Sequence, residues 1–168
     1  NLDCYGEGEE LTIEVVLGKL LVDRKLTIST AESCTGGMIA SRLINYPGIS
    51  EVFLEGAVTY SNEAKERTLK VKKETLDTYG AVSEETAKEM AIGISKRTGS
   101  DISVVTTGIA GPGGGSEEKP VGLVYIGLYY KGNVKAFRYI FNGNRHNVRA
   151  KATVTALDLV RREILKDN

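Results

Sequence analysis

The sequence has no tryptophan, a single histidine, two cysteines and three prolines among its 168 residues. Two cysteines cannot form the disulfide framework of a small secreted domain, and no basic-then-apolar leader opens the chain, so we expect a cytoplasmic location. One histidine and two distant cysteines also supply too few soft ligands for a zinc site, which usually takes four. We therefore expect no metal and no other cofactor.

Net charge and long apolar runs are lacking as well. The 22 Lys and Arg residues are balanced by 22 Asp and Glu residues, so no overall basic field is available for nucleic acid or an anionic membrane. The longest apolar stretches, such as residues 121–130, contain glycine and fall short of the roughly 20 residues that a membrane helix needs. We expect no nucleic-acid partner and no membrane partner, and any anionic ligand must be held locally.

The composition that remains is that of one ordinary globular domain, with 41% hydrophobic and 26% charged residues. Residues 1–10 are acidic and contain glycine, with little that could pack, and we interpret them as a linker or a trimmed end. The folded domain is expected to span residues 11–168.

Strand-like runs alternate with helical patterns through the first two thirds of the chain, and a hairpin and a long helix follow. The patterns predict helices over residues 10–24, 38–44, 62–69, 84–98 and 144–165, and strands over residues 26–30, 52–61, 102–107, 121–130 and 134–141. This order favours an α/β fold, a three-layer α/β/α sandwich with a mixed, mostly parallel sheet, in which the hairpin supplies the antiparallel part.

Ser33 lies between a predicted strand and a predicted helix, with glycines just behind it. Backbone N–H groups near Thr35 and Gly36 could stabilise an oxyanion beside such a serine. Alternatively, Ser33 or Thr35 merely caps the helix. The nucleophile elbow of α/β-hydrolases is excluded, because Ala31 and Thr35 stand where that motif requires glycines.

A serine nucleophile needs a base, and the single histidine, His146, lies in a polar segment typical of surface residues. Lys65 is the alternative, because desolvation can lower the pKa of a lysine until it accepts a serine proton. Tyr60, at a strand end, could relay or orient that proton. The competing interpretation is that Lys65 belongs to a solvated basic face and that the Tyr60 ring simply packs.

Two further loops could contact a ligand. The glycine-rich residues 108–120 can approach a ligand closely, although they match neither a P-loop nor a dinucleotide fingerprint. Residues 142–147 lead into the last helix and offer a helix N-terminus, with Arg145 and Arg149, to a phosphate. Simple capping by an asparagine, with two exposed arginines, explains this last segment equally well.

Two residues beside Ser33 keep more than one interpretation. Cys34, at a helix N-terminus, could be a nucleophile in its own right or a small buried thiol behind Ser33. Glu32 could orient a base or a ribose hydroxyl, or it could make a salt bridge.

Three segments together closely resemble the CinA C-terminal domain family. They are residues 30–37 (TAESCTGG), residues 59–65 (TYSNEAK), and residues 108–112 (GIAGP) with residues 119–122 (KPVG). The similarity spans about residues 11–165. Members of this family are nicotinamide-nucleotide amidases (NMN deamidases), which hydrolyse the carboxamide of nicotinamide mononucleotide to nicotinic acid mononucleotide and ammonia.

The resemblance assigns roles to residues of this chain. It implies Ser33 as the nucleophile, with Tyr60 and Lys65 as its activating partners. It also implies that the mononucleotide is held by Arg145 and by the glycine-rich loop, which includes Gly108, Ala110 and Gly111. A nucleotide-binding regulatory module without turnover, using the same loops, is the alternative function.

The resemblance further implies a homodimer. It also suggests that the chain is a fragment of a longer protein, because longer CinA proteins carry an N-terminal domain similar to molybdopterin-binding domains. The partners expected are therefore a mononucleotide substrate, a second copy of the chain and this missing domain.

Overall fold

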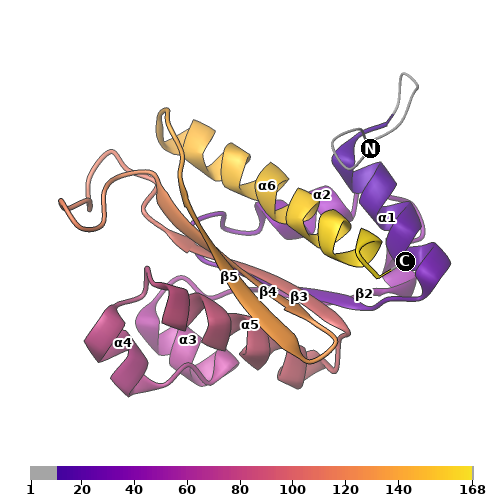
Figure 1. Ribbon diagram of the computed structural model, residues 1–168, viewed down its shortest axis with the longest axis horizontal. Helices are drawn as coiled ribbons and strands as arrows, with labels where there is room; N and C mark the ends of the chain where they lie inside the picture. Colours follow the sequence, from indigo (N-terminus) through magenta and orange to yellow (C-terminus); the bar gives the residue numbers. More distant parts are fainter. Residues whose placement is uncertain (1–10, 168) are drawn as a thin grey trace.

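The computed structural model describes residues 11–167, which fold around a five-stranded mixed sheet (Figure 1). The strands lie in the order β2-β1-β3-β4-β5. Their bounds are β1 Ile28–Glu32, β2 Phe53–Val58, β3 Ile102–Gly108, β4 Leu123–Tyr130 and β5 Asn133–Ile140. β1 pairs in parallel with β2 and β3, whereas β4 pairs antiparallel with β3 and β5, so β4 runs against the other four strands.

Helices cover both faces of this sheet. Their bounds are α1 Ile13–Arg24, α2 Met38–Leu43, α3 Asn62–Leu69, α4 Lys73–Tyr79, α5 Glu84–Thr98 and α6 Arg145–Leu165, with a short 3₁₀ helix at Ile49–Glu51. In Figure 1, α1, α2 and α6 lie on one face, and α3, α4 and α5 lie on the other. The predicted three-layer α/β/α architecture with a mixed sheet is confirmed.

Local capping explains why several helices begin where the sequence indicates. The Ser61 hydroxyl accepts a hydrogen bond from the first turn of α3, and the Ser83 hydroxyl does the same for α5. α6 begins with a capping box formed by Asn144 and Asn147. Gly99, in the left-handed conformation, ends α5. The three N-terminal caps therefore fix where α3, α5 and α6 begin.

The structure also departs from the predicted elements. α4 was not predicted, because its seven residues bury only Leu76 and carry no long periodic pattern. β1 runs two residues further along the chain than predicted, so it ends at Glu32 and brings Ser33 directly after the strand. The expected linker over residues 1–10 lies outside the described residues.

Hydrophobic side chains pack on both faces of the sheet. On the face of α1, α2 and α6, the larger core includes Leu17, Leu43 and Val160; on the opposite face, Met90 and Ile94 of α5 pack against β3. Every residue of β1 is buried, which is what a parallel strand covered by helices on both faces requires. The two central strands are therefore a rigid base for the loops that leave them.

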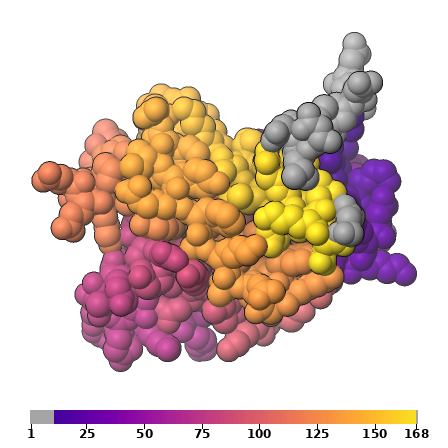
Figure 2. All heavy atoms as spheres, in the orientation of Figure 1, coloured from indigo at the N-terminus to yellow at the C-terminus, as the bar shows by residue number. Residues whose placement is uncertain are grey.

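The carboxyl ends of β1, β2, β3 and β5 lie at one edge of the sheet, because these four strands share a direction. The chain leaves β1 for β2 on one side and later returns to β3 on the other side of β1. Ligands of open α/β sheets bind at such a switch point. The loop between β3 and β4 projects beyond the body of the molecule at this edge (Figure 2).

Gly93 permits the close contact between α5 and the end of α3. A Cβ added at this position would lie 1.9 Å from the Leu69 carbonyl oxygen, so the two helices would have to separate. We expect Gly93→Ala to lower the free energy of unfolding by about 1–3 kcal/mol, as overpacking does. Chemical denaturation would measure this, with Lys96→Ala, an exposed change on the same helix, as the control. Equal stability of the two variants would contradict the prediction.

Candidate active site

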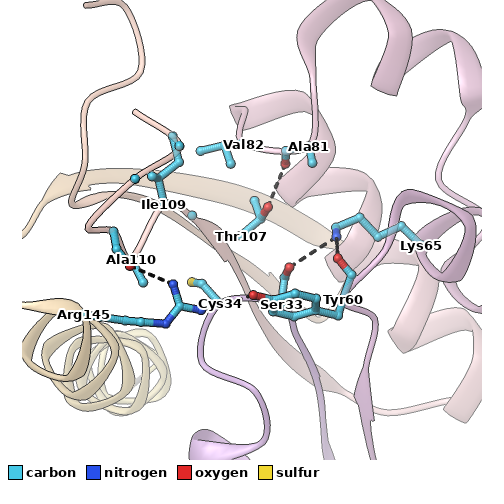
Figure 3. Close-up of a pocket in the computed structure, with 14 residues that line it drawn as sticks. Ser33, Cys34, Tyr60, Lys65, Ala81, Val82, Thr107, Ile109, Ala110 and Arg145 are labelled. Atoms are coloured by element: carbon cyan, nitrogen blue, oxygen red, sulfur yellow. Dashed lines mark hydrogen bonds between the residues drawn. The ribbon is translucent and has the colours of Figure 1, made fainter. Parts of the chain in front are cut away.

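A cavity of about 280 Å³ opens at the switch point of the sheet (Figure 3). It is formed by the turn after β1, the segment between β2 and α3, the segment between α4 and α5, the glycine-rich loop and the start of α6. Its lining residues are Ser33, Cys34, Tyr60, Lys65, Ala81, Val82, Thr107, Gly108, Ile109, Ala110, Gly111, Gly113, Gly114 and Arg145. Five segments of the chain therefore meet around one space.

Ser33 is the first residue after β1 and is 8% exposed. Its backbone N–H donates to the Thr106 carbonyl of the neighbouring strand at 3.0 Å, which extends the parallel pairing by one residue. The Ser33 hydroxyl is thus presented at the cavity from the end of a central strand.

Lys65 reaches this hydroxyl from α3 (Figure 3). Its Nζ lies 3.3 Å from Ser33 Oγ, 2.9 Å from the Thr59 carbonyl oxygen and 3.2 Å from the Tyr60 carbonyl oxygen. The side chain is 1% exposed, and no carboxylate forms an ion pair with it within residues 11–167. This burial lowers the pKa of Lys65 from its ordinary value.

The contacts of Lys65 suit a neutral amine. Such an amine has two N–H groups and one lone pair. When the two N–H groups donate to the carbonyls of Thr59 and Tyr60, the lone pair faces Ser33 Oγ. The alternative that Lys65 belongs to a solvated basic face does not fit its burial.

Tyr60 occupies a different place from the one expected of a proton relay. Its side chain is 63% exposed, and its hydroxyl accepts a hydrogen bond from Arg145 Nη2 at 3.2 Å. In residues 11–167, no hydrogen bond joins this hydroxyl to Ser33 or Lys65. The contact of Tyr60 with Lys65 is through the backbone carbonyl, so the residue orients the amine through its main chain.

Arg145, the first residue of α6, connects two walls of the cavity. Besides the Tyr60 hydroxyl, its guanidinium donates to the Gly111 carbonyl at 2.8 Å. A guanidinium has five N–H donors, so three remain for a ligand. The three loop residues predicted to hold substrate, Gly108, Ala110 and Gly111, all line the cavity.

The structure places Thr35 and Gly36, the other two predicted ligand residues, outside the cavity lining. The Thr35 side chain is fully buried and hydrogen-bonds to Glu32 and Thr106. The Gly36 N–H donates to the Ser33 carbonyl oxygen at 3.1 Å, so it closes the turn instead of facing the cavity. Both residues shape the turn that carries Ser33.

Cys34 lines the cavity beside Ser33, but its thiol does not suit a nucleophile. The thiol is buried, and this burial raises the pKa of Cys34 to about 11. Very little thiolate is therefore present near neutral pH. His146 is exposed and does not line the cavity.

The sequence interpretation missed three lining residues. Ala81 and Val82 lie between α4 and α5, and the Thr107 hydroxyl donates to the Ala81 carbonyl oxygen at 2.7 Å, which holds that segment against β3. Thr107 could have been found, since it stands at the end of a predicted central strand. Ala81 and Val82 carry no polar group and follow an unpredicted helix, so no sequence signal identified them.

The part of the chain that the structure describes contains neither a candidate metal centre nor a candidate membrane span. Among residues 11–167, no three His, Cys, Asp or Glu side chains gather closely enough to hold a metal ion. Over the same residues, no helix has the length and apolar character needed to cross a membrane.

Comparison with known proteins shows which family shares this arrangement. The family model described as the CinA C-terminal domain matches residues 10–164. A Clostridium perfringens protein, provisionally named competence-damage inducible protein, is 65% identical over 164 residues, which are 98% of this chain and 40% of that protein. The chain thus spans about two fifths of the length of the curated relatives that it matches.

Solved structures agree with the sequence match. The competence/damage inducible protein CihA from Agrobacterium tumefaciens is 41% identical, with a TM-score of 0.84 over 93% of this chain and 98% of that one. A CinA superfamily protein from Klebsiella pneumoniae is 34% identical, with a TM-score of 0.88 over 92% of this chain and 96% of that one. Sequence and fold together show that the chain belongs to the CinA C-terminal domain family.

Proposed function

We propose that this domain is an amidohydrolase that converts nicotinamide mononucleotide to nicotinic acid mononucleotide and ammonia through a serine acyl-enzyme. The observation that carries the proposal is the buried Lys65 amine, held by two carbonyls at 3.3 Å from the Ser33 hydroxyl. A serine beside a base of lowered pKa is the arrangement that nucleophilic catalysis requires.

In the proposed reaction, the Lys65 amine takes the hydroxyl proton as Ser33 Oγ attacks the carboxamide carbon. The tetrahedral intermediate collapses when its C–N bond breaks, and the proton held by Lys65 passes to the leaving nitrogen, which departs as ammonia. Water then attacks the Ser33 ester with Lys65 again as the base. The acid is released and the hydroxyl of Ser33 is restored.

An oxyanion forms in both tetrahedral intermediates and needs hydrogen-bond donors. Because the Gly36 N–H is used within the turn, we assign this role to the backbone N–H of Cys34, the first amide after the nucleophile. Cys34 lines the cavity, which supports the assignment.

The resemblance to the family and the cavity support the proposed substrate class. A volume of about 280 Å³ lies at the low end of small-molecule sites and suits a mononucleotide whose phosphate reaches the open mouth. Arg145 at that mouth has spare N–H donors for a phosphate. The positive pyridinium ring of this substrate withdraws electrons from its carboxamide and so favours attack.

Ammonia release from nicotinamide mononucleotide by the purified chain, measured with a metal chelator present, is the direct test. We expect one ammonia and one nicotinic acid mononucleotide per turnover. Saturable binding of the mononucleotide without ammonia release would instead identify a nucleotide-binding regulatory module.

The first prediction concerns the nucleophile. Ser33→Ala should keep the fold and the affinity for the mononucleotide but lose several powers of ten in kcat, because no acyl-enzyme can form. Cys34→Ala should change kcat only mildly. Steady-state kinetics and ligand titration measure both effects. Activity that survives in Ser33→Ala and disappears in Cys34→Ala would identify the cysteine as the nucleophile.

The second prediction concerns the base. Since Lys65 must be neutral to accept a proton, kcat/KM should rise with pH and level off above the lowered pKa of this lysine. Lys65→Met should abolish turnover, whereas Tyr60→Phe should cause a smaller loss through its contact with Arg145. A fully active Lys65→Met variant would exclude Lys65 as the base.

The same burial predicts a pH-dependent stability difference. A lysine whose pKa is lowered in the folded state binds its proton more tightly when the chain is unfolded, so its burial destabilises the fold at neutral pH. Lys65→Met should therefore be at least as stable as the parent near pH 7. The difference should shrink as pH rises from the lowered pKa to the ordinary value of 10.5. Denaturant titrations at several pH values would measure it.

The third prediction concerns the phosphate. A charge-assisted contact is worth roughly 1.5–3 kcal/mol, so Arg145→Ala should raise KM for nicotinamide mononucleotide by about ten- to a hundredfold. Nicotinamide riboside lacks the phosphate and should already be a poor substrate, and its kinetics should barely change in this variant. Equal losses on both substrates would mean that Arg145 acts only by joining Gly111 to Tyr60.

A further inference from the structure

The turn that carries Ser33, residues 33–37, lies between two charged side chains that do not line the cavity. Glu32 precedes the turn and is 1% exposed. Arg149 is half-buried and reaches the turn from α6, one helical turn after Arg145. The chemistry described above uses neither residue.

The Glu32 carboxylate accepts hydrogen bonds from the turn itself and from the start of α2. Its Oε1 accepts from the Thr35 hydroxyl at 2.6 Å and from the Ile39 N–H at 2.8 Å, and its Oε2 accepts from the Ala40 N–H at 3.2 Å. α2 has glycine at its N-cap and no side-chain cap of its own, so Glu32 satisfies the free N–H groups of this helix from the adjacent strand.

The Thr35 hydroxyl extends this network to β3. It lies 2.7 Å from the Thr106 hydroxyl. A carboxylate only accepts hydrogen bonds, so the Thr35 hydroxyl donates its single hydrogen to Glu32. The Thr35 oxygen must therefore accept a hydrogen bond from the Thr106 hydroxyl. The Ser33 N–H donates to the carbonyl of the same Thr106. Glu32 and Thr106 together thereby fix the turn relative to the central strands.

Arg149 holds the middle of the turn. Its Nε donates to the Cys34 carbonyl at 2.9 Å, and its Nη2 donates to the Thr35 carbonyl at 3.3 Å. In a trans peptide the C=O and N–H groups point in opposite directions. Fixing these two carbonyls therefore also fixes the N–H groups of Thr35 and Gly36. The Gly36 N–H in turn donates to the Ser33 carbonyl, whose peptide group carries the Cys34 N–H.

We propose that Glu32 and Arg149 are positioning residues that hold the Ser33 hydroxyl and the adjacent Cys34 amide in their reactive arrangement. Glu32 does so by accepting hydrogen bonds from N–H and hydroxyl groups, and Arg149 does so by donating to backbone carbonyls. This inference rests on the proposed function of Ser33. Neither residue lines the cavity, so we expect each to act on the rate of the chemical step and not on binding.

The test compares Arg149→Met, Arg149→Lys and Glu32→Gln with the parent. A misplaced reacting group can cost about a hundredfold in rate, so we expect kcat of Arg149→Met and Glu32→Gln to fall by about ten- to a hundredfold, with KM within about threefold. Arg149→Lys keeps the positive charge and one donating nitrogen in place of two, and should recover part of the loss. The rising limb of the pH profile, which Lys65 sets, should not move.

Lys151→Met is the matched control, because Lys151 is another α6 cation that donates to a backbone carbonyl, that of Asn142, away from the Ser33 turn. Its kcat should equal that of the parent. Thermal unfolding of every variant shows whether a loss of kcat merely follows a loss of fold. Unchanged kcat in folded Arg149→Met and Glu32→Gln, or a rise in KM without a fall in kcat, would overturn the proposal.

A second readout separates this inference from the identity of the substrate. A fluorophosphonate reacts with an activated serine whatever amide the enzyme hydrolyses, and intact mass gives the rate of labelling at Ser33. We expect slower labelling in Arg149→Met and Glu32→Gln than in Lys151→Met. If the parent is labelled but releases no ammonia from nicotinamide mononucleotide, the substrate is wrong while the positioning roles still stand. A parent that is not labelled at Ser33 would overturn both.

Discussion

A lysine side chain, Lys65, that is buried with no carboxylate partner in the described part of the chain is the constraint on which this site depends. Burial disfavours the charged form, and the two carbonyls of Thr59 and Tyr60 give the amine directional contacts in place of an ion pair. Those carbonyls stay in place because the segment after β2 turns directly into α3, whose start is capped by Ser61. The close packing of α3 on α5 at Gly93 then keeps the amine inside the cavity. The contact between the Lys65 amine and the Ser33 hydroxyl is therefore a consequence of how α3 packs on the sheet.

Strand direction explains why separate segments can cooperate. β1, β2, β3 and β5 all end at the same edge of the sheet, and each is followed by a loop or helix start that contributes to the cavity. The proposed nucleophile comes from the end of β1, the proposed base from the helix after β2, the glycine-rich wall from the loop after β3, and the cation Arg145 from the helix after β5. Because the strands are fixed by a core on both faces, the four contributions keep their relative positions without a metal or disulfide among the described residues.

Much of this arrangement could be predicted from the sequence, and the exceptions share a physical cause. The order of strands and helices follows from periodicity, and the caps at Ser83 and Gly99 can be recognised locally. The burial of Lys65 could not be predicted from the sequence. Exposed lysines follow it closely along the chain, and only the tertiary fold distinguishes Lys65 from them. The places of Thr35 and Gly36 depend on backbone hydrogen bonds within one turn. A residue pattern can identify a turn, but it does not say which of its amides face the cavity.

The two arginines at the start of α6 show how one helix can contact both the cavity wall and the turn that carries Ser33. Arg145 and Arg149 are four residues apart and so share a face of the helix. Arg145 contacts the cavity wall at Gly111 and Tyr60, whereas Arg149 contacts the carbonyls behind Ser33. The capping box of Asn144 and Asn147 fixes the helix start between them, and Val148 is buried in the core. A shift of α6 would therefore move Arg145 and Arg149 together, and with them the contacts at the cavity wall and at the Ser33 turn.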